Sequence, residues 1–227
     1  MNTIEQAAAV EFDRWAASGR AESMERGHQP MVSSLLDQWA FGASDRVLDV
    51  GCGNGWVVRE MCSRGAGAGV GVDISAGMIA CATKVAAPNT TFLVASAEKL
   101  PFDNASFSAI TSVESLYYYA DPAAALREWY RISRAGGRLG VAIDLYADSP
   151  VGTVWRDVLD VSVHLLSEAE WVEELKRAGW RNVRTWRVLD PSPVKSESDF
   201  EASRYWPDYA TYTGFRKQGS LVLEATR

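Results

Sequence analysis

The sequence predicts an α/β protein in which a doubly wound, mostly parallel sheet of seven strands carries helices on both faces. Two observations indicate this fold class. Short apolar segments rich in β-favouring residues recur along the chain, and they alternate with helical patterns over most of the 227 residues. A chain of this length can form one domain with a large core. We expect the strands at 46–50, 68–74, 90–96, 107–113, 138–144, 181–189 and 219–226.

The segments between the strands carry helix signals. Asp121 and Pro122 form a helix start, and Leu126 and Trp129 then recur on one helix face. Ser167, followed three residues later by a glutamate, is a capping-box pattern that starts another helix. The last strand follows a long segment without a helical pattern, and we therefore expect this strand to run antiparallel to its neighbours.

Three segments lie outside the alternation, at 1–44, 145–166 and 190–218. In an open α/β sheet, ligands bind beyond the carboxyl ends of the strands, and insertions beside such a site usually select the substrate. We therefore expect these three segments to form lids over that edge of the sheet, the first of them helical. The segment 45–144 is expected to bind a cofactor, within a single domain that spans 1–227.

A glycine-rich turn follows the first predicted strand and opens the next helix. Three glycines in five residues supply backbone conformations barred to other residues and let a ligand approach the main chain. Asp73 ends the second strand, at the place where a βαβ nucleotide site puts a carboxylate that accepts from ribose hydroxyls. These features predict a nucleoside-containing cofactor bound by Gly51, Gly53, Asn54, Gly55 and Asp73.

The residue before the turn distinguishes two kinds of cofactor. A pyrophosphate prefers glycines spaced G-x-G-x-x-G at a helix N-terminus and no further anion nearby. Here the spacing is G-x-G-x-G, and Asp49 lies two residues before the first glycine. A carboxylate at that point repels phosphates but suits a ligand that carries an ammonium and a sulfonium. A nicotinamide dehydrogenase is therefore disfavoured.

With Asp49, the turn and Asp73, the segment 47–55 resembles the first motif of class I, Rossmann-like S-adenosylmethionine-dependent methyltransferases that act on small molecules. The segments 95–107 and 110–116 are similar to later motifs of this family, in the same order. The resemblance implies S-adenosylmethionine as the cofactor and an antiparallel last strand. It also implies further cofactor contacts from Asp49, Ile74, Met78, Ser96, Ala97, Glu98 and Val113.

The segment that resembles the adenine-binding stretch of the family departs from the usual form. The family commonly has an acidic residue where this chain has Ser96, and another where it has Ser108. A serine hydroxyl can still hydrogen-bond the adenine amino group, but the contact is neutral and weaker than one to a carboxylate.

Methyl transfer from a sulfonium is an in-line displacement that needs no metal, and it needs a base only where the acceptor must lose a proton. The candidate catalytic residues are His28, Glu114 and Tyr117. A histidine is the natural base near neutral pH, and Glu114 with Tyr117 follows the fourth strand, where that strand opens onto the cleft. Each has a plain alternative: His28 as a hydrogen-bonded surface group, Glu114 as a solvated loop carboxylate and Tyr117 as a packing residue.

The composition of the chain indicates which classes of partner to expect. A net charge of −6 argues against a nucleic-acid partner, and no apolar run is long enough to span a membrane. The three cysteines show no metal-binding spacing, which favours reduced thiols and a cytoplasmic protein. Trp15, Trp155 and Trp206 lie in the three lid segments, where aromatic rings can shape the pocket of an aromatic or apolar acceptor.

We therefore interpret the chain as an S-adenosylmethionine-dependent methyltransferase with a small-molecule acceptor. An RNA or protein methyltransferase and a non-catalytic S-adenosylmethionine-binding protein stay open as alternatives. The pattern leaves open the acceptor atom and the oligomeric state.

Overall fold

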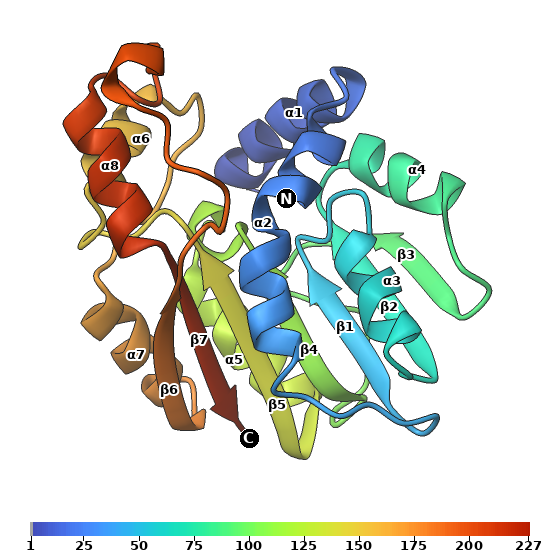
Figure 1. The fold of residues 1–227 in the computed structure, drawn as a ribbon. Helices are drawn as coiled ribbons and strands as arrows, with labels where there is room; N and C mark the ends of the chain where they lie inside the picture. The colour runs from blue at the N-terminus through green and yellow to red at the C-terminus, as the bar shows by residue number, and fades with distance from the viewer. Residues whose placement is uncertain (1) are drawn as a thin grey trace.

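The computed structural model describes residues 2–227, with residues 21–24 described by their backbone alone. A seven-stranded sheet in the order β3-β2-β1-β4-β5-β7-β6 runs through the centre of the molecule (Figure 1). Its strands are β1 Arg46–Val50, β2 Ala68–Asp73, β3 Thr90–Val94, β4 Phe107–Val113, β5 Ser133–Ile143, β6 Arg181–Val188 and β7 Ser220–Thr226.

The strand directions confirm the predicted fold class. Strands β3, β2, β1, β4 and β5 pair in parallel, whereas β7 runs antiparallel to both β5 and β6. The central strand β1 contributes Val47, Leu48 and Val50 to the core, all of them buried, as a strand covered on both faces requires.

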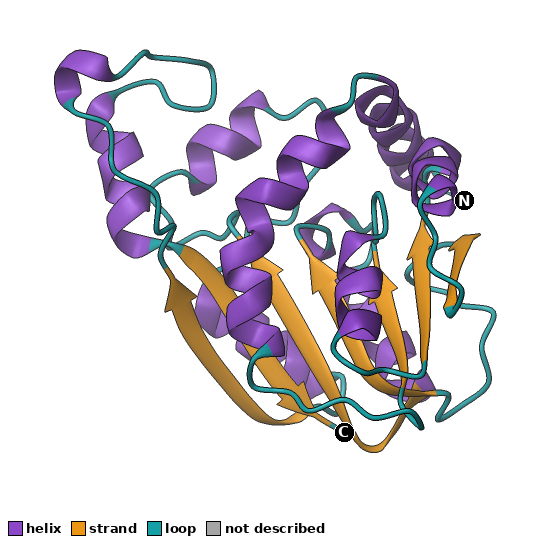
Figure 2. Cartoon of the chain, turned by 45° about the vertical axis from the view of Figure 1, so that its right-hand side comes forward, coloured by secondary structure: helices purple, strands orange, loops and turns teal. Residues whose placement is uncertain are grey.

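Helices cover both faces of this sheet. In Figures 1 and 2, α2 and α3 lie on one face and α5 and α7 lie on the other. The helices are α1 Thr3–Ala17, α2 Arg20–Leu36, α3 Trp56–Ser63, α4 Ala76–Lys84, α5 Pro122–Ile132, α6 Gly152–Val158, α7 Glu168–Arg177 and α8 Tyr209–Gln218, with short 3-10 turns η1 Leu116–Tyr118 and η2 Glu197–Asp199. None of the helices in this described part has the length and apolar character needed to cross a membrane.

The predicted helix starts are present, but neither α6 nor α8 was predicted. Asp121 caps α5 by accepting from the Ala124 N–H at 2.9 Å, and Ser167 forms the capping box that begins α7. The segment before β7, predicted to lack a helix, contains α8, which begins where Asp208 accepts from the Thr211 N–H at 2.7 Å. The sequence of α8 is only weakly amphipathic, so it gives little sign of a helix. The N-cap and the aromatic contacts of α8 stabilise it.

The segments outside the alternation gather beyond the carboxyl ends of the parallel strands. Figure 1 shows α1, α6 and α8 at this edge, with α1 beside α4. Helix α2 begins at the same edge and then descends along the sheet, where Met31, Leu35 and Leu36 are buried. The N-terminal segment thus supplies both a cover over the strand ends and part of the core.

Close packing of α2 on the sheet depends on a glycine. A Cβ atom placed on Gly140 of β5 would overlap the side chain of Leu35. Gly140→Ala should therefore lower the free energy of unfolding by about 1–3 kcal/mol in urea titrations, because α2 must shift outward.

A glycine in α2 itself provides the matched control. Apart from the backbone of α2 itself, no atom of the described residues lies within 4 Å of a Cβ placed on Gly27, and alanine is the better helix former. Gly27→Ala should leave the free energy of unfolding unchanged or raise it by up to about 1 kcal/mol. Equal stability of the Gly140 and Gly27 variants would contradict the close approach of α2 to β5.

Candidate active site

The glycine turn after β1 brings main chain to an open cavity. The Gly51 and Cys52 N–H groups donate to the Val72 carbonyl at 2.8 and 3.0 Å. Gly51 has φ +75° and Gly53 has φ +51°, the left-handed region that glycine adopts without strain. Apart from its neighbours in the chain, no atom of the described residues lies within 4 Å of a Cβ placed on Gly53, so the turn leaves room there for a ligand against the backbone.

Asp73, at the end of β2, connects this turn to the start of α4. Its Oδ2 accepts from the Gly53 N–H and its Oδ1 from the Ser75 N–H, both at 2.9 Å. Burial raises the pKa of the Asp73 carboxyl, and these N–H bonds oppose the shift. Asp73 lines the cavity, as a ribose ligand would.

Asp49 lies beneath the turn, within β1. Only 1% of this residue is exposed, and its Oδ1 accepts from the Thr111 hydroxyl at 2.6 Å. Burial raises the pKa of Asp49 to about 7, against the opposing effect of the Thr111 hydrogen bond. A cationic ligand group beside Asp49 would restore its charged form.

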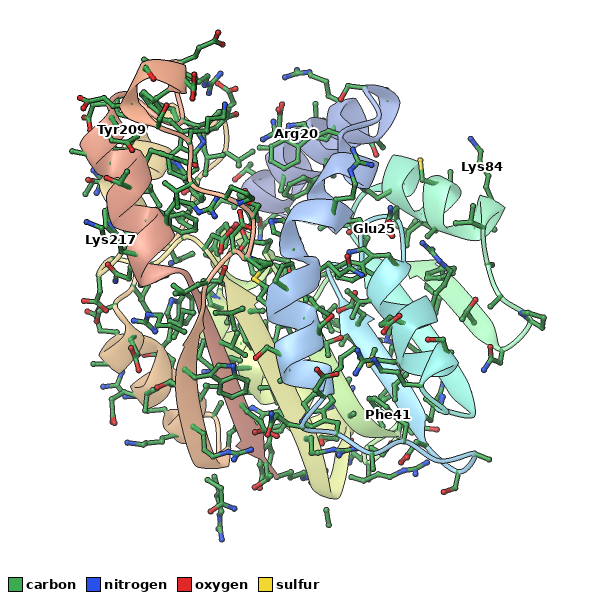
Figure 3. The ribbon with its side chains drawn as sticks, viewed as in Figure 1. Arg20, Glu25, Phe41, Lys84, Tyr209 and Lys217 are labelled. Atoms are coloured by element: carbon green, nitrogen blue, oxygen red, sulfur yellow. The ribbon has the colours of Figure 1, made fainter. Side chains whose placement is uncertain are left out.

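Asn54 and Gly55 hold the turn in place. The Asn54 side chain accepts from the Trp56 N–H at 3.2 Å and donates to Glu25 of α2 at 3.0 Å (Figure 3). Gly55 packs against the Phe92 ring, where a Cβ would overlap it, and it is not among the residues that line the cavities on either side of the turn. Its cofactor contact stays a prediction.

The cavity beside Asp73 is lined by most of the residues predicted to contact the cofactor. The predicted residues that line it are Gly51, Gly53, Asp73, Ile74, Met78, Ser96, Ala97, Glu98, Val113 and Glu114. Helix α1 adds Glu5, Ala8, Phe12 and Trp15 to the lining; of these, the sequence had indicated only Trp15, and it had done so for the acceptor pocket. The helical spacing of the last three was a usable signal for a buried helix face, but it did not indicate what the face covers.

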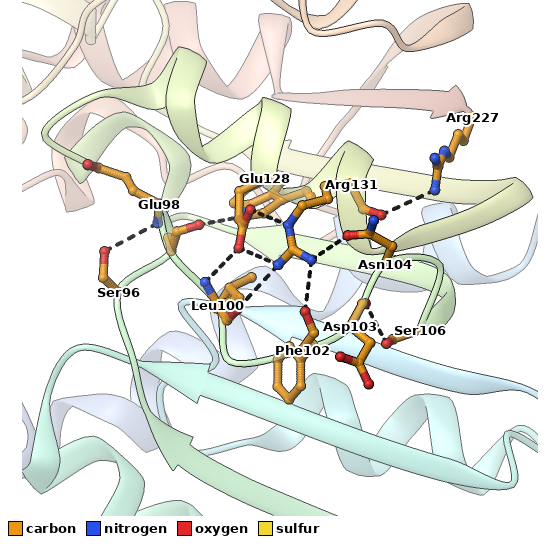
Figure 4. Close-up of polar contacts among 12 residues, drawn as sticks. Ser96, Glu98, Leu100, Phe102, Asp103, Asn104, Ser106, Glu128, Arg131 and Arg227 are labelled. Carbon is orange, nitrogen blue, oxygen red and sulfur yellow. Dashed lines mark hydrogen bonds and ion pairs between the residues drawn. The ribbon is translucent and has the colours of Figure 1, made fainter.

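The loop that forms one wall of this cavity is tied to α5. Glu128 accepts from the Leu100 N–H at 2.8 Å, and Arg131 donates to the Phe102 carbonyl at 2.9 Å (Figure 4). The indole N–H of Trp129 donates to the Ala97 carbonyl at 3.1 Å. These bonds hold the wall that contains Ser96 and Ala97 in one position.

A second cavity continues from the first beneath the turn. The residues that line it include Asp49, Asn54, His28, Trp56 and Glu114. It joins the first cavity at Gly51, Gly53, Met78, Val113 and Glu114. The two cavities thus adjoin along the glycine turn, with the open position at Gly53 between them and the Asp49 carboxyl in the second.

A third cavity, lined largely by aromatic side chains, meets the other two at Glu114. It is lined by Trp15, Arg20, His28, Glu114, Tyr117, Tyr118, Asp144, Leu145, Trp155, Leu159, Tyr205 and Trp206. The walls come from α1, η1, α6 and the loop before α8, so all three expected lid segments contribute. The Arg20 guanidinium carbon lies 4.0 Å from the Trp15 ring centroid, which fixes one wall (Figure 3).

The three predicted catalytic residues converge where the cavities meet. Tyr117 donates to Glu114 Oε2 at 2.6 Å, and the Asp144 N–H donates to Glu114 Oε1. His28 Nε2 lies 4.0 Å from Asp144 Oδ2, and its side chain is 17% exposed. Asp144 was missed, although its place at the end of β5 parallels that of Asp73 at the end of β2.

The backbone at Glu114 is strained. Its φ of +51° is unusual for a residue with a side chain, and its N–H donates to the Ala142 carbonyl at 2.9 Å. Strain of this kind persists where the surrounding structure imposes it, and it concentrates at ligand sites. The turn directs the Glu114 carboxylate to the junction of the three cavities.

Burial governs the protonation of this cluster. It lowers the pKa of His28, against the influence of Asp144, and so favours the neutral imidazole. It raises the pKa of Glu114 well above the ordinary value, with Asp144 adding to the shift. One ligand atom from each of His28, Glu114 and Asp144 lies within 4.8 Å of the others, a spacing that could hold a metal ion, and both Glu114 oxygens accept hydrogen bonds.

Comparison with known proteins agrees with this geometry. The family described as a methyltransferase domain matches residues 48–141. The 27-O-demethylrifamycin SV methyltransferase of Amycolatopsis mediterranei is 26% identical over 215 residues, which cover 90% of this chain and 76% of that protein. The demethylmenaquinone methyltransferase of Mycolicibacterium vanbaalenii is 31% identical over 169 residues, which cover 64% of this chain and 72% of that protein.

A solved structure matches over nearly the whole chain. It is the methyltransferase in the complex with the Haloferax volcanii Trm112 methyltransferase activator, with a TM-score of 0.87 and 29% identity over 95% of this chain and 97% of that one. The glycine turn with Asp49 and Asp73, the sheet order and these matches lead to one conclusion. The chain belongs to the class I S-adenosylmethionine-dependent methyltransferases.

Proposed function

We propose that this methyltransferase acts on a small molecule bound in the third, aromatic cavity. The observation that carries the proposal is the junction at Glu114, where this cavity opens onto the two that suit the cofactor. S-adenosylmethionine supplies an activated methyl group, so the protein must chiefly align an acceptor with it. The names of the Amycolatopsis and Mycolicibacterium relatives denote small organic acceptors, which supports this interpretation.

The cofactor residues have distinct proposed roles. Asp73 accepts from the ribose hydroxyls, and the backbone at Gly51 and Gly53 lies against the chain that joins ribose to amino acid. Asp49 balances the positive amino acid end. Ile74, Met78 and Ala97 enclose the adenine, with Ser96, Glu98 and Val113 at the borders of its cavity.

The acceptor is activated by the polar cluster at the junction. The neutral His28 imidazole takes the proton of an acceptor hydroxyl or amine, and Asp144 stabilises the imidazolium that forms. Tyr117 and the Asp144 N–H orient Glu114 toward the acceptor. The aromatic walls exclude water and align the acceptor ring.

A second candidate is a methyltransferase that works with a protein partner. It is favoured by the Haloferax relative, which was solved in complex with a Trm112 methyltransferase activator. If the isolated chain methylates small molecules, the first candidate is supported. If methyl transfer requires a Trm112-type protein and a macromolecular acceptor, the second is supported.

Transfer of a labelled methyl group from S-adenosylmethionine tests the first candidate directly. The purified chain would be offered phenols, quinols, aromatic amines and bulk tRNA. We expect label only in small aromatic acceptors. Label in tRNA, or none in any small molecule while the cofactor still binds, would contradict the proposal.

Replacement of Asp73 tests the ribose contact. Asp73→Ala should weaken S-adenosylmethionine binding by about 1–3 kcal/mol in calorimetry, because a charged hydrogen bond to the ribose is lost. Asp103→Ala, which removes an exposed carboxylate from the loop after β3, should leave the affinity unchanged. An Asp73 variant that is folded and binds as tightly as the wild type would refute this role.

The raised pKa of Asp49 predicts a pH dependence of cofactor binding. A cationic ligand favours the ionised carboxylate, whose fraction falls as the pH drops through about 7. The affinity for S-adenosylmethionine should therefore fall by about tenfold between pH 8 and pH 6. Asp49→Asn is the control, because the pH dependence of its affinity reports only the titration of the cofactor and of other groups. If the affinity of the wild type depends on pH no more steeply than that of this variant, the prediction is contradicted.

Replacement of His28 tests the proposed base. His28→Ala should reduce turnover by about 10²–10⁴-fold while S-adenosylmethionine affinity changes little. In the wild type, turnover should be on its plateau at pH 7 and fall in acid, since burial holds the pKa of His28 below its ordinary value. His164→Ala is the matched control, because His164 does not line any of the three cavities. Normal turnover in the His28 variant would exclude it as the base.

A further inference from the structure

The first turn of α1 closes the end of the nucleoside cavity that lies next to the loop after β3. Glu5 of α1 and Ser96 of this loop both line the cavity. The Ser96 hydroxyl donates to Glu5 Oε1 at 2.5 Å. Residues that are 91 positions apart in the chain thus meet at one wall of the cofactor site.

The hydrogen-bond directions show which group can receive a donor from a ligand. Ser96 uses its only hydroxyl hydrogen on Glu5, and it accepts from the Glu98 N–H at 3.2 Å. Glu5 Oε2 accepts from the Asn2 N–H at 2.8 Å, within the capping box of α1. Both Glu5 oxygens therefore act as acceptors, and a carboxylate oxygen can accept more than one hydrogen bond.

Glu98, the other carboxylate of this wall, is directed elsewhere. Its Oε1 accepts from the Asp121 N–H at 2.8 Å, at the start of α5. Figure 4 shows the Glu98 N–H directed toward Ser96. Of these two carboxylates, Glu5 is therefore the one that accepts a hydrogen bond from Ser96.

We propose that Glu5 supplies, from the N-terminal helix, the carboxylate that receives the 6-amino group of the cofactor's adenine. The loop itself has a serine at the position where an acid is usual, and the structure places an acid from another segment on that serine. Adenine presents a donor at position 6, whereas hypoxanthine presents a carbonyl oxygen that a carboxylate repels. Glu5 thereby selects an adenine nucleoside.

The position of α1 does not depend on Glu5 alone. At the other end of the helix, Asp13 accepts from the Ser75 hydroxyl at 2.5 Å and from the Gly77 N–H at 2.8 Å. These bonds dock α1 on the start of α4. Base recognition by Glu5 and docking by Asp13 can therefore be separated by mutation.

The test compares two ligands that differ at position 6 of the base, S-adenosyl-L-homocysteine and S-inosyl-L-homocysteine. In calorimetry, the wild type should bind the adenosyl ligand about 10- to 100-fold more tightly. Glu5→Gln should bring this ratio close to one, because an amide can either accept from the amine or donate to the carbonyl. Asp13→Ala should weaken both ligands by the same factor and leave the ratio unchanged.

A compensating substitution gives an independent check. Glu5→Ala should reduce adenosyl affinity by about tenfold or more, and the double variant E5A/S96D should recover it, because the acid is then returned to the loop. S96D alone should bring no gain, since two carboxylates would then compete at one point.

The outcomes separate base recognition from a purely structural role. An unchanged ratio of the two affinities in Glu5→Gln, or no recovery in E5A/S96D while that variant is folded, would overturn the proposal. Both readouts are equilibrium binding to the demethylated cofactor product or its inosyl analogue. They therefore do not depend on which acceptor the enzyme methylates.

Discussion

The Asp73 carboxylate joins the two turns on which the active site is built. One oxygen accepts from the turn after β1 at Gly53, and the other accepts from the turn after β2 at Ser75. The carboxyl ends of neighbouring parallel strands are thus fixed relative to each other by one side chain. The open space at Gly53 and the cavity beside the end of β2 both border this arrangement. Without it, the glycine turn would lose the hydrogen bond that orients its cavity-facing backbone.

The same region holds acids in an environment that disfavours their charge. Burial raises the pKa of Asp49, Asp73 and Glu114, and among the described residues each is held by N–H or O–H donors instead of an ion pair. A ligand that brings positive charge relieves this cost, whereas a pyrophosphate would increase it. S-adenosylmethionine carries a sulfonium and an ammonium, which explains why a glycine turn of nucleotide-binding type occurs here together with so many carboxylates.

The features that could be predicted from the sequence are those that depend on neighbouring residues in the chain. Buried strands read as apolar runs, and the turn with Asp49 and Asp73 lies within one βαβ unit, so the sheet and the cofactor class could be predicted. Helix α8 was missed because its amphipathic pattern is weak and its stability comes from its cap and from contacts with distant aromatic residues. Asp144 and Glu5 were missed because their roles depend on which segments meet in space. Glu5 and Ser96 are 91 residues apart in the chain, so no local sequence pattern predicts their contact.

Helix α1 contributes to both sides of the reaction. Its first turn places Glu5 in the nucleoside cavity, and its last turn places Trp15 in both that cavity and the aromatic one. Trp15 is itself held by Glu11, whose Oε1 accepts the indole N–H at 2.7 Å, and by the Arg20 guanidinium. One helix thus carries residues of both cavities. With the roles proposed above, a displacement of α1 changes the wall beside the methyl donor and the Trp15 wall of the space offered to the acceptor together.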